Sequence, residues 1–319
     1  MRNHSYKPEG MLISRAENRE AMATPAALER AMVHGTILEG VAVLCDSELA
    51  LHVDLGCMEG IIPREEAVWH RPGEAPKDIA VITRVGKAVC FKVSGFTQRG
   101  GKTCALLSRS AAQRECAQNY LAALCPGDII PARVTHLEPF GAFVDIGCGM
   151  PSLLSVDCIS VSRIAHPRDR FTAGAYIPVV VRQIDRTQNR IFVSHRELLG
   201  TWAENAAQFS AGQTVAGIIR SIESYGIFVE LAPNLAGLAE LRDSRAPSLD
   251  LTVGRSAAVY IKSIIPERMK VKLVLIDTYS GLPQTGTPRY YIDPAVVGHI
   301  DRWRYSPPAS PRVIETVFA

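Results

Sequence analysis

Two short segments of the chain carry aromatic residues at the same spacing. The first begins at Phe140 and the second begins at Tyr225, 85 positions later. In each segment a glycine follows the first ring. A phenylalanine, Phe143 or Phe228, stands three residues after that first ring. Flat rings exposed on a strand can stack on unpaired bases, because every base presents a π-face. These residue types therefore indicate stacking against single-stranded nucleic acid.

The alternation of side chains along a strand predicts which rings face water. Phe143 and Asp145 fall on the same face of the first segment, as Phe228 and Glu230 do in the second. Because a carboxylate is rarely buried without a partner, we expect the Asp145 and Glu230 faces to be wet. Phe143 and Phe228 are then expected to be exposed as well.

The first ring of each segment needs a separate argument. Phe140 precedes Phe143 by three residues, which in a flat strand would put the two rings on opposite faces. A glycine inside a strand often marks a bulge, so Gly141 and Gly226 would bring both rings to one side. Tyr225 favours this interpretation, because a phenol usually keeps its hydroxyl near water. The alternative, with Phe140 and Tyr225 in the core, stays open at this point.

The aromatic segments belong to an internal repeat of short strands. Gly127 and Gly212 open the two copies and have the same separation as the rings. Expected strands are 129–134, 140–146, 151–154, 177–184 and 190–194, then 215–222, 225–231, 237–238, 257–264 and 270–276. A looser copy has expected strands at 36–43, 49–55, 60–63, 79–85, 88–93 and 103–107. Short strands separated by turn signals predict all-β barrels or sandwiches.

Helices are expected between these copies. One follows Pro25, one runs from the capping box at Ser110 to about Leu124, and one follows the capping box at Ser194. The last places Leu198, Trp202, Ala206 and Phe209 on one stripe, which we interpret as packing between barrels. Residues 1–23 show no periodicity and are expected to be flexible. The predicted division is 1–33, 34–109, 110–126, 127–194, 195–211, 212–277 and 278–319.

The order of these segments resembles the S1-type RNA-binding domain. The resemblance is carried by Gly127-Asp128-Ile129 and by the stretches 140–144, 181–185 and 190–194. This family has a five-stranded OB-fold barrel, repeated in tandem in the largest bacterial small-subunit ribosomal protein. The resemblance implies a mainly β chain of three tandem five-stranded OB-fold barrels joined by short α-helical linkers. The barrel at 34–109 would be degenerate.

The resemblance also implies a set of RNA-contacting residues. The family pattern of two aromatics, a residue after the third strand and a charged pair matches Phe140, Phe143, Ser155, Asp185 and Arg190. In the last copy it matches Tyr225, Phe228 and Lys270, while Glu240 and Pro266 depart from it. We expect the phosphates to meet Arg182, Arg190, Arg220, Lys262 and Lys270.

The first copy departs further from the family pattern. Leu49 and His52 occupy the aromatic positions, and Pro63 stands where the family often has histidine. This surface would not stack two bases, and we expect the first copy to be structural or to contact protein. Stacking on His52 is a minor alternative.

Composition excludes several other classes. A net charge of +3 favours stacking on single strands over duplex binding. The eight cysteines include no Cys-x-x-Cys pair, which favours reduced thiols over disulfides or zinc. No apolar run approaches the ~20 residues of a membrane span. We expect a cytoplasmic protein with no metal, no cofactor, no small-molecule substrate and no enzymatic activity.

The C-terminal extension allows two interpretations. Arg289-Tyr290-Tyr291 and Arg302-Trp303-Arg304-Tyr305 interleave basic and aromatic residues and could bind single strands. We prefer the other interpretation, in which two short strands, 289–292 and 313–318, dock onto the last barrel.

The predicted function is binding of single-stranded RNA, in particular mRNA, by a ribosome-associated protein acting in translation. The small ribosomal subunit is the expected assembly partner. The main alternative is a regulatory module that uses its barrels to hold a protein, with RNA binding secondary. A third possibility is an accessory to an RNA-processing enzyme on a separate chain.

Overall fold

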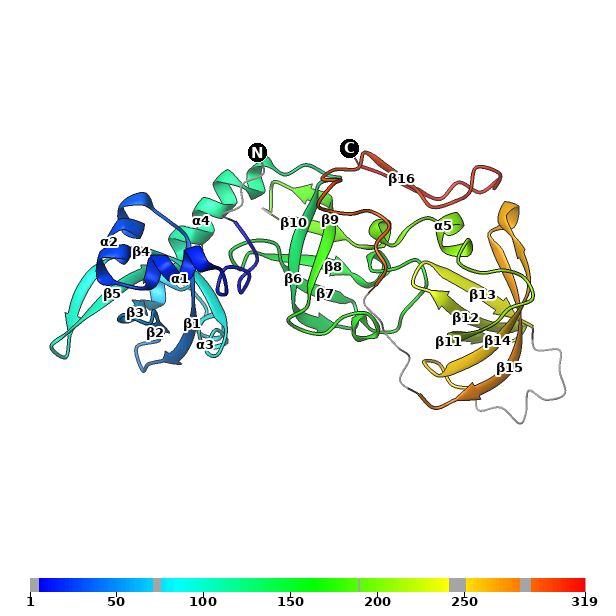
Figure 1. Cartoon of the computed structure of the whole chain (residues 1–319), viewed down its shortest axis with the longest axis horizontal. Coiled ribbons are helices and arrows are strands. Elements are labelled where there is room, and N and C mark those ends of the chain that lie inside the picture. The colour runs from blue at the N-terminus through cyan, green and yellow to red at the C-terminus, as the bar shows by residue number, and fades with distance from the viewer. Residues whose placement is uncertain (1–5, 71–75, 189, 241–250, 282–287, 319) are drawn as a thin grey trace. The chain divides into compact units, whose positions relative to one another are not determined.

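The computed structural model describes residues 6–70, 76–188, 190–240, 251–281 and 288–318 (Figure 1). Fifteen of its strands form three closed barrels of five strands each. Barrel 1 consists of β1 (Leu38–Cys45), β2 (Leu51–Asp54), β3 (Glu59–Ile62), β4 (Ala88–Arg99) and β5 (Lys102–Ser108). Barrel 2 consists of β6 (Ile129–Glu138), β7 (Gly141–Asp145), β8 (Pro151–Ser155), β9 (Tyr176–Asp185) and β10 (Arg190–Ser194). Barrel 3 consists of β11 (Thr214–Glu223), β12 (Gly226–Ala232), β13 (Leu235–Ala239), β14 (Ser256–Ile265) and β15 (Lys270–Tyr279).

The three barrels share one topology. In barrel 3 the strand order around the barrel is β11-β12-β13-β15-β14, and barrels 1 and 2 repeat it with their own strands. The first three strands form an antiparallel meander, and the third strand closes the barrel by pairing parallel with the fifth. The predicted mainly β fold of three tandem five-stranded barrels is confirmed.

Alternate residues of each strand fill the barrel interiors, as strand geometry requires. In barrel 1, Leu38, Leu51, Ile62, Phe91 and Leu107 are fully buried and belong to one core cluster. Burial of these large side chains is the main stabilising contribution, at about 1.5–3 kcal/mol each.

The prediction of a strand at 79–85 is wrong. It contains helix α3 (Asp78–Ile82), whose Val81 is buried in the core of barrel 1. Five other strands already close this barrel, so a strand here would have no neighbour for its backbone hydrogen bonds.

The other helices begin and end differently from the prediction. The helices α1 (Ala16–Met22) and α2 (Pro25–His34) lie near the N-terminus, and only α2 was expected. Helix α4 (Arg109–Asn119) is capped by Ser108 rather than Ser110. The expected helix after Ser194 is interrupted at Gly200, where φ is +83°, so that only α5 (Trp202–Ala206) is α-helical.

The predicted flexibility of residues 1–23 is wrong where the structure describes them. Glu9 is buried, and its Oε1 lies 2.7 Å from Nε of Arg109. The carboxylate of Glu39 accepts the backbone N–H groups of Gly10, Leu12 and Ile13. These buried charges account for the ordered path of a segment without periodicity. Residues 1–5 lie outside the described residues.

The C-terminal extension supports the structural interpretation. Strand β16 (Arg302–Arg304) pairs with β17 (Glu315–Val317), and no strand forms at the expected range 289–292. Trp303 and Tyr305 are buried in one cluster with Trp202 and the core of barrel 3. The predicted packing role of the stripe that contains Trp202 is confirmed, because its side chains lie in this cluster.

Candidate nucleic-acid interface

Each of barrels 2 and 3 presents a pair of perpendicular aromatic rings. The ring centroids of Phe140 and Phe143 lie 6.0 Å apart at 88°. Those of Tyr225 and Phe228 lie 6.3 Å apart at 89°. Phe140 is 55% exposed and Tyr225 is 61% exposed, whereas Phe143 and Phe228 are half-buried. The alternative that placed Phe140 and Tyr225 in the core is therefore wrong.

The first ring of each pair is positioned by a tight turn and not by a bulge at glycine. Glu223 pairs directly with Gly226, so Tyr225 is the second residue of a two-residue turn between β11 and β12. The register shift in this hairpin lies between Ile219 and Ser221, on the other strand. Phe140 occupies the same place between β6 and β7.

The glycines after these rings are needed for a close backbone approach. A Cβ on Gly226 would lie 2.7 Å from the carbonyl oxygen of Ala239, on the neighbouring strand β13. A Cβ on Gly141 would lie 2.5 Å from the carbonyl oxygen of Leu154, on β8. Both distances are below ordinary contact, so any side chain would push the third strand away from the aromatic strand.

The premise that Asp145 and Glu230 are wet is wrong, because both are buried and satisfied. Asp145 accepts the backbone N–H groups of Glu9, Gly147 and Gly149 at 2.7–3.0 Å. Burial raises the pKa of Asp145 to about 7, although these hydrogen bonds favour the charged form. Both carboxylates stand on the outer faces of their barrels, but polar groups from elsewhere in the chain cover them.

The buried Glu230 also removes Arg220 from the predicted phosphate contacts. The Nε of Arg220 lies 2.7 Å from Oε2 of Glu230, and its Nη1 lies 2.8 Å from Asp169. Arg170 approaches the same Glu230 oxygen at 2.6 Å. The side chains of Arg170, Arg220 and Glu230 are only 5–6% exposed. The prediction for Arg220 is contradicted, because its guanidinium is buried against carboxylates.

His136 is a third ring on barrel 2 that the sequence reasoning missed. Its ring centroid lies 6.5 Å from that of Phe143 at 29°, and its Nε2 lies 2.7 Å from Oε1 of Glu138. His136 is exposed on β6, opposite the aromatic strand. Pairing β6 with β7 across the two-residue turn would have found it.

The polar residues predicted for barrel 2 lie around its last two strands. Asp185 accepts hydrogen bonds from the hydroxyl and backbone N–H of Thr187 and from the N–H of Gln188, and so holds the turn between β9 and β10. These hydrogen bonds lower the pKa of Asp185. Arg190 is exposed, and its backbone lies opposite that of Asp185 in the antiparallel pairing of β10 with β9.

Two other predicted residues of barrel 2 have local partners. The hydroxyl of Ser155 donates to Asp157 at 2.5 Å. Arg182 is exposed on β9, and its Nη1 lies 2.7 Å from Sγ of Cys158.

In barrel 3 the predicted lysines are exposed. Lys262 lies on β14 and Lys270 begins β15. Glu240, at the position of the family histidine, is also exposed, and Pro266 begins a short 3-10 helix between β14 and β15.

The matching surface of barrel 1 is closed. His52 is buried, with Nδ1 2.6 Å from Glu59 and Nε2 3.1 Å from Asp46. Burial lowers the pKa of His52, but the two carboxylates raise it further, so that the net shift is upward. The β1–β2 turn carries Leu49 at a φ of +62°. The imidazole is therefore held edge-on by carboxylates and offers no open face to a base.

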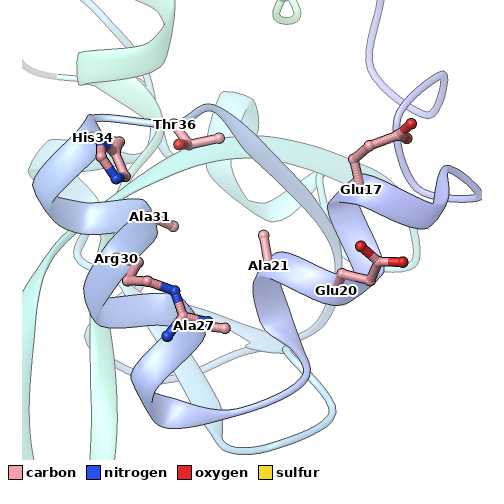
Figure 2. A pocket seen from close by; sticks show the side chains of 8 residues that line it. All are labelled: Glu17, Glu20, Ala21, Ala27, Arg30, Ala31, His34 and Thr36. Atoms are coloured by element: carbon pink, nitrogen blue, oxygen red, sulfur yellow. The ribbon is translucent and has the colours of Figure 1, made fainter.

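A pocket beside α1 and α2 is lined by acidic Glu17 and Glu20 and by basic Arg30 and His34 (Figure 2). No phenylalanine, tyrosine or tryptophan is among the described residues that line it. Across the described ranges no group of three His, Cys, Asp or Glu side chains could hold a metal ion. Among the same residues no helix is long and apolar enough to cross a membrane.

Comparisons with known proteins found similar ribosomal proteins. The chain is 30% identical over 198 residues to small ribosomal subunit protein bS1 of Staphylococcus aureus (strain COL), covering 59% of this chain and 50% of the relative. It is 33% identical over 178 residues to the bS1 protein of Leuconostoc lactis, covering 53% and 41%. The chain thus spans about half the length of the curated relatives it matches.

A solved multidomain protein with nucleic acid binding domains from Streptococcus pneumoniae is 14% identical, with a TM-score of 0.24, and the match covers 76% of this chain and 73% of that one. Residues 125–196, which contain barrel 2 and its ring pair, match the family model of the S1 RNA binding domain. Residues 125–196 are therefore identified as an S1-type RNA-binding domain, and about half of the chain is similar to bS1 proteins.

Proposed function

We propose that barrels 2 and 3 bind single-stranded RNA on the outer faces that carry the two ring pairs. The observation that carries this proposal is the repeated geometry, in which an exposed ring and a half-buried ring stand perpendicular on the same hairpin. In such a pair the edge of one ring meets the face of the other, and Phe140 and Tyr225 remain more than half exposed, so each barrel offers at least one ring to a base. Stacking of this kind contributes about 1–3 kcal/mol per base and tolerates any sequence.

Exposed basic residues of the same two barrels would meet the phosphates. On barrel 2 these are Arg182 and Arg190, and on barrel 3 they are Lys262 and Lys270. Few cations take part, so the salt dependence of binding should be shallow compared with that of a duplex-DNA binder.

Contacts of a single asparagine support joint binding by the two barrels. Asn234, next to β13 of barrel 3, donates to the backbone carbonyls of Arg196 and Gly200 and accepts the N–H of Val161. Tyr305 of the C-terminal extension donates to the Asn234 carbonyl at 2.7 Å. Two weak sites held together in this way act at a high effective concentration on one strand.

The names of the relatives support a role in translation. Because the curated relatives are small ribosomal subunit proteins, we propose that the chain associates with the small ribosomal subunit and binds mRNA there. We propose a binding role without catalysis. Barrel 1 would contact protein, since His52 is closed to bases while Val43 and Leu44 are 56% and 51% exposed nearby on β1.

Replacing Phe143 with alanine should weaken binding of a single-stranded RNA by about 1–3 kcal/mol, because one stacking surface is lost. Fluorescence anisotropy with a labelled oligouridine would measure the affinity. The matched control is Tyr176→Ala, an exposed aromatic residue at the opposite end of β9 from Asp185, which should leave the affinity unchanged. An unaltered affinity for a folded Phe143→Ala protein would remove Phe143 from the interface.

A further inference from the structure

The outward residues level with Phe228 form a row across barrel 3, which we call the ring row. Strand pairing places Ser221 of β11 and Leu238 of β13 on either side of Phe228. Leu238 in turn pairs with Lys272 of β15, which pairs with Ser263 of β14. The ring row of barrel 3 therefore has Lys272 as its fourth member.

The side chain of Lys272 points away from the interior of barrel 3. Its neighbours Val271 and Leu273 are 2% and 3% exposed and belong to the core cluster, while Lys272 is exposed. Side chains alternate along a strand, so Lys272 and Phe228 share the outer face. Two strand spacings separate them, or about 10 Å.

Barrel 2 has a phenylalanine at the same position. Phe192 of β10 pairs in parallel with Leu153 of β8, as Lys272 pairs with Leu238. The next residues, Val193 and Leu154, are 1% and 0% exposed, so Phe192 and Leu153 point outward, where both are half-buried.

The close contacts of Gly141 and Gly226 indicate which residue of β8 lies beside Phe143. The close approach of Gly141 to the Leu154 carbonyl repeats that of Gly226 to the Ala239 carbonyl. Since Ala239 follows Leu238, which pairs with Phe228, the same register places Leu153 beside Phe143. The ring row of barrel 2 thus contains His136, Phe143, Leu153, Phe192 and Gln183.

We propose that the fourth position of the ring row sets how each barrel holds RNA. This inference rests on the proposed function. Phe192 gives barrel 2 a further stacking surface, for a nucleotide beyond the one on Phe143. Lys272 gives barrel 3 a cation there, for a phosphate of the strand that lies on Phe228. Barrel 2 then binds mainly by stacking, and barrel 3 binds with a larger share of charge neutralisation.

Barrel 1 has neither an aromatic ring nor a lysine at the fourth position of its ring row. Its ring row contains Leu44, the closed His52, Ile61 and, in fourth place, Leu106. Ile61 is itself buried, in a small cluster with Ala50 and Cys104. This aliphatic row offers no open ring and no cation, which agrees with a barrel that leaves RNA binding to the other two.

Salt titrations of the full chain with a labelled oligouridine of twelve nucleotides separate the two roles. Lys272→Ala should make the slope of log K against log salt shallower by about 0.7, since one phosphate contact is lost. Phe192→Leu keeps an apolar side chain of similar volume but removes the ring. It should weaken binding by about 5- to 150-fold with an unchanged slope. Phe192→Trp should retain affinity.

Matched variants decide the outcome. Lys102→Ala removes an exposed lysine of barrel 1 and should leave the slope unchanged. If a folded Phe192→Leu protein binds within twofold of the unmodified chain, or if Lys272→Ala leaves the slope unchanged, the inference is overturned. Phe143→Ala and Phe228→Ala distinguish failure of this inference from failure of the proposed function. If these two variants also bind RNA as tightly as the unmodified chain, the proposed function fails. If they weaken binding but the Phe192 and Lys272 variants do not, only the role of the fourth position is refuted.

Discussion

Replacing Glu230 with glutamine should destabilise barrel 3 by about 3–5 kcal/mol, the usual cost of breaking a buried ion pair by removing one partner. Glu230 is the carboxylate shared by Arg170 and Arg220, and all three side chains are almost fully buried. Burial raises the pKa of Glu230, but the two guanidinium groups outweigh it and keep the pKa below its usual value. In the variant Arg220 would keep its ion pair with Asp169, whereas the buried Arg170 would lose its carboxylate and keep hydrogen bonds to the Asp169 carbonyl and the Ser160 hydroxyl.

Urea unfolding followed by tryptophan fluorescence would measure this loss. Trp202 and Trp303 lie in the same core cluster as the interior of barrel 3 and report on its unfolding. Glu223→Gln is the matched control, because Glu223 is exposed at the end of β11 and should change stability by less than about 0.5 kcal/mol. A loss below about 1 kcal/mol for Glu230→Gln would show that the cluster contributes little to stability.

Lowering the pH from 6.5 to 4 should cost the folded protein about 3 kcal/mol through His195 alone. This imidazole is fully buried, with Nδ1 3.0 Å from the Ile159 carbonyl and Nε2 3.1 Å from the Tyr290 hydroxyl. Burial lowers its pKa to about 4, the Ile159 carbonyl opposes this shift, and Arg170 adds to it.

The direction of the pH dependence follows from where protons bind. Between pH 6.5 and 4 the unfolded chain protonates His195 while the folded protein does not, so stability falls as the pH falls. Above pH 6.5 the imidazole is neutral in both the folded and the unfolded state, so protonation of His195 costs the folded protein no stability.

Urea unfolding of the unmodified chain and of His195→Gln at several pH values would isolate this contribution. The difference between the two proteins should be greatest above pH 6.5 and should shrink by about 3 kcal/mol toward pH 4. The difference is needed because other groups also titrate in this range. Burial raises the pKa of Glu39, for example, to about 7. His34→Gln, at an exposed histidine, is the control for the removal of an imidazole. A constant difference between the chain and His195→Gln would show that His195 takes up its proton equally well in the folded state.

The alternation and repetition of residues predicted most of the fold and both ring pairs. These signals are local, since strand periodicity depends on neighbours along the chain. They predicted that Phe143 and Phe228 lie on the outer face. The segment 79–85 shows the limit of this approach. It has the residues of a strand, but the closed barrel leaves it without a strand partner.

Alternation along each strand predicts which side chains point into each barrel and which point out. Contacts between segments far apart in the chain set which of the outward positions remain open. Asp145 and Arg220 are outward or polar by pattern, yet the backbone of Glu9 covers the first and Glu230 and Asp169 hold the second. The physical reason is that a charged group is buried when partners from distant segments satisfy it, and periodicity carries no information about such partners.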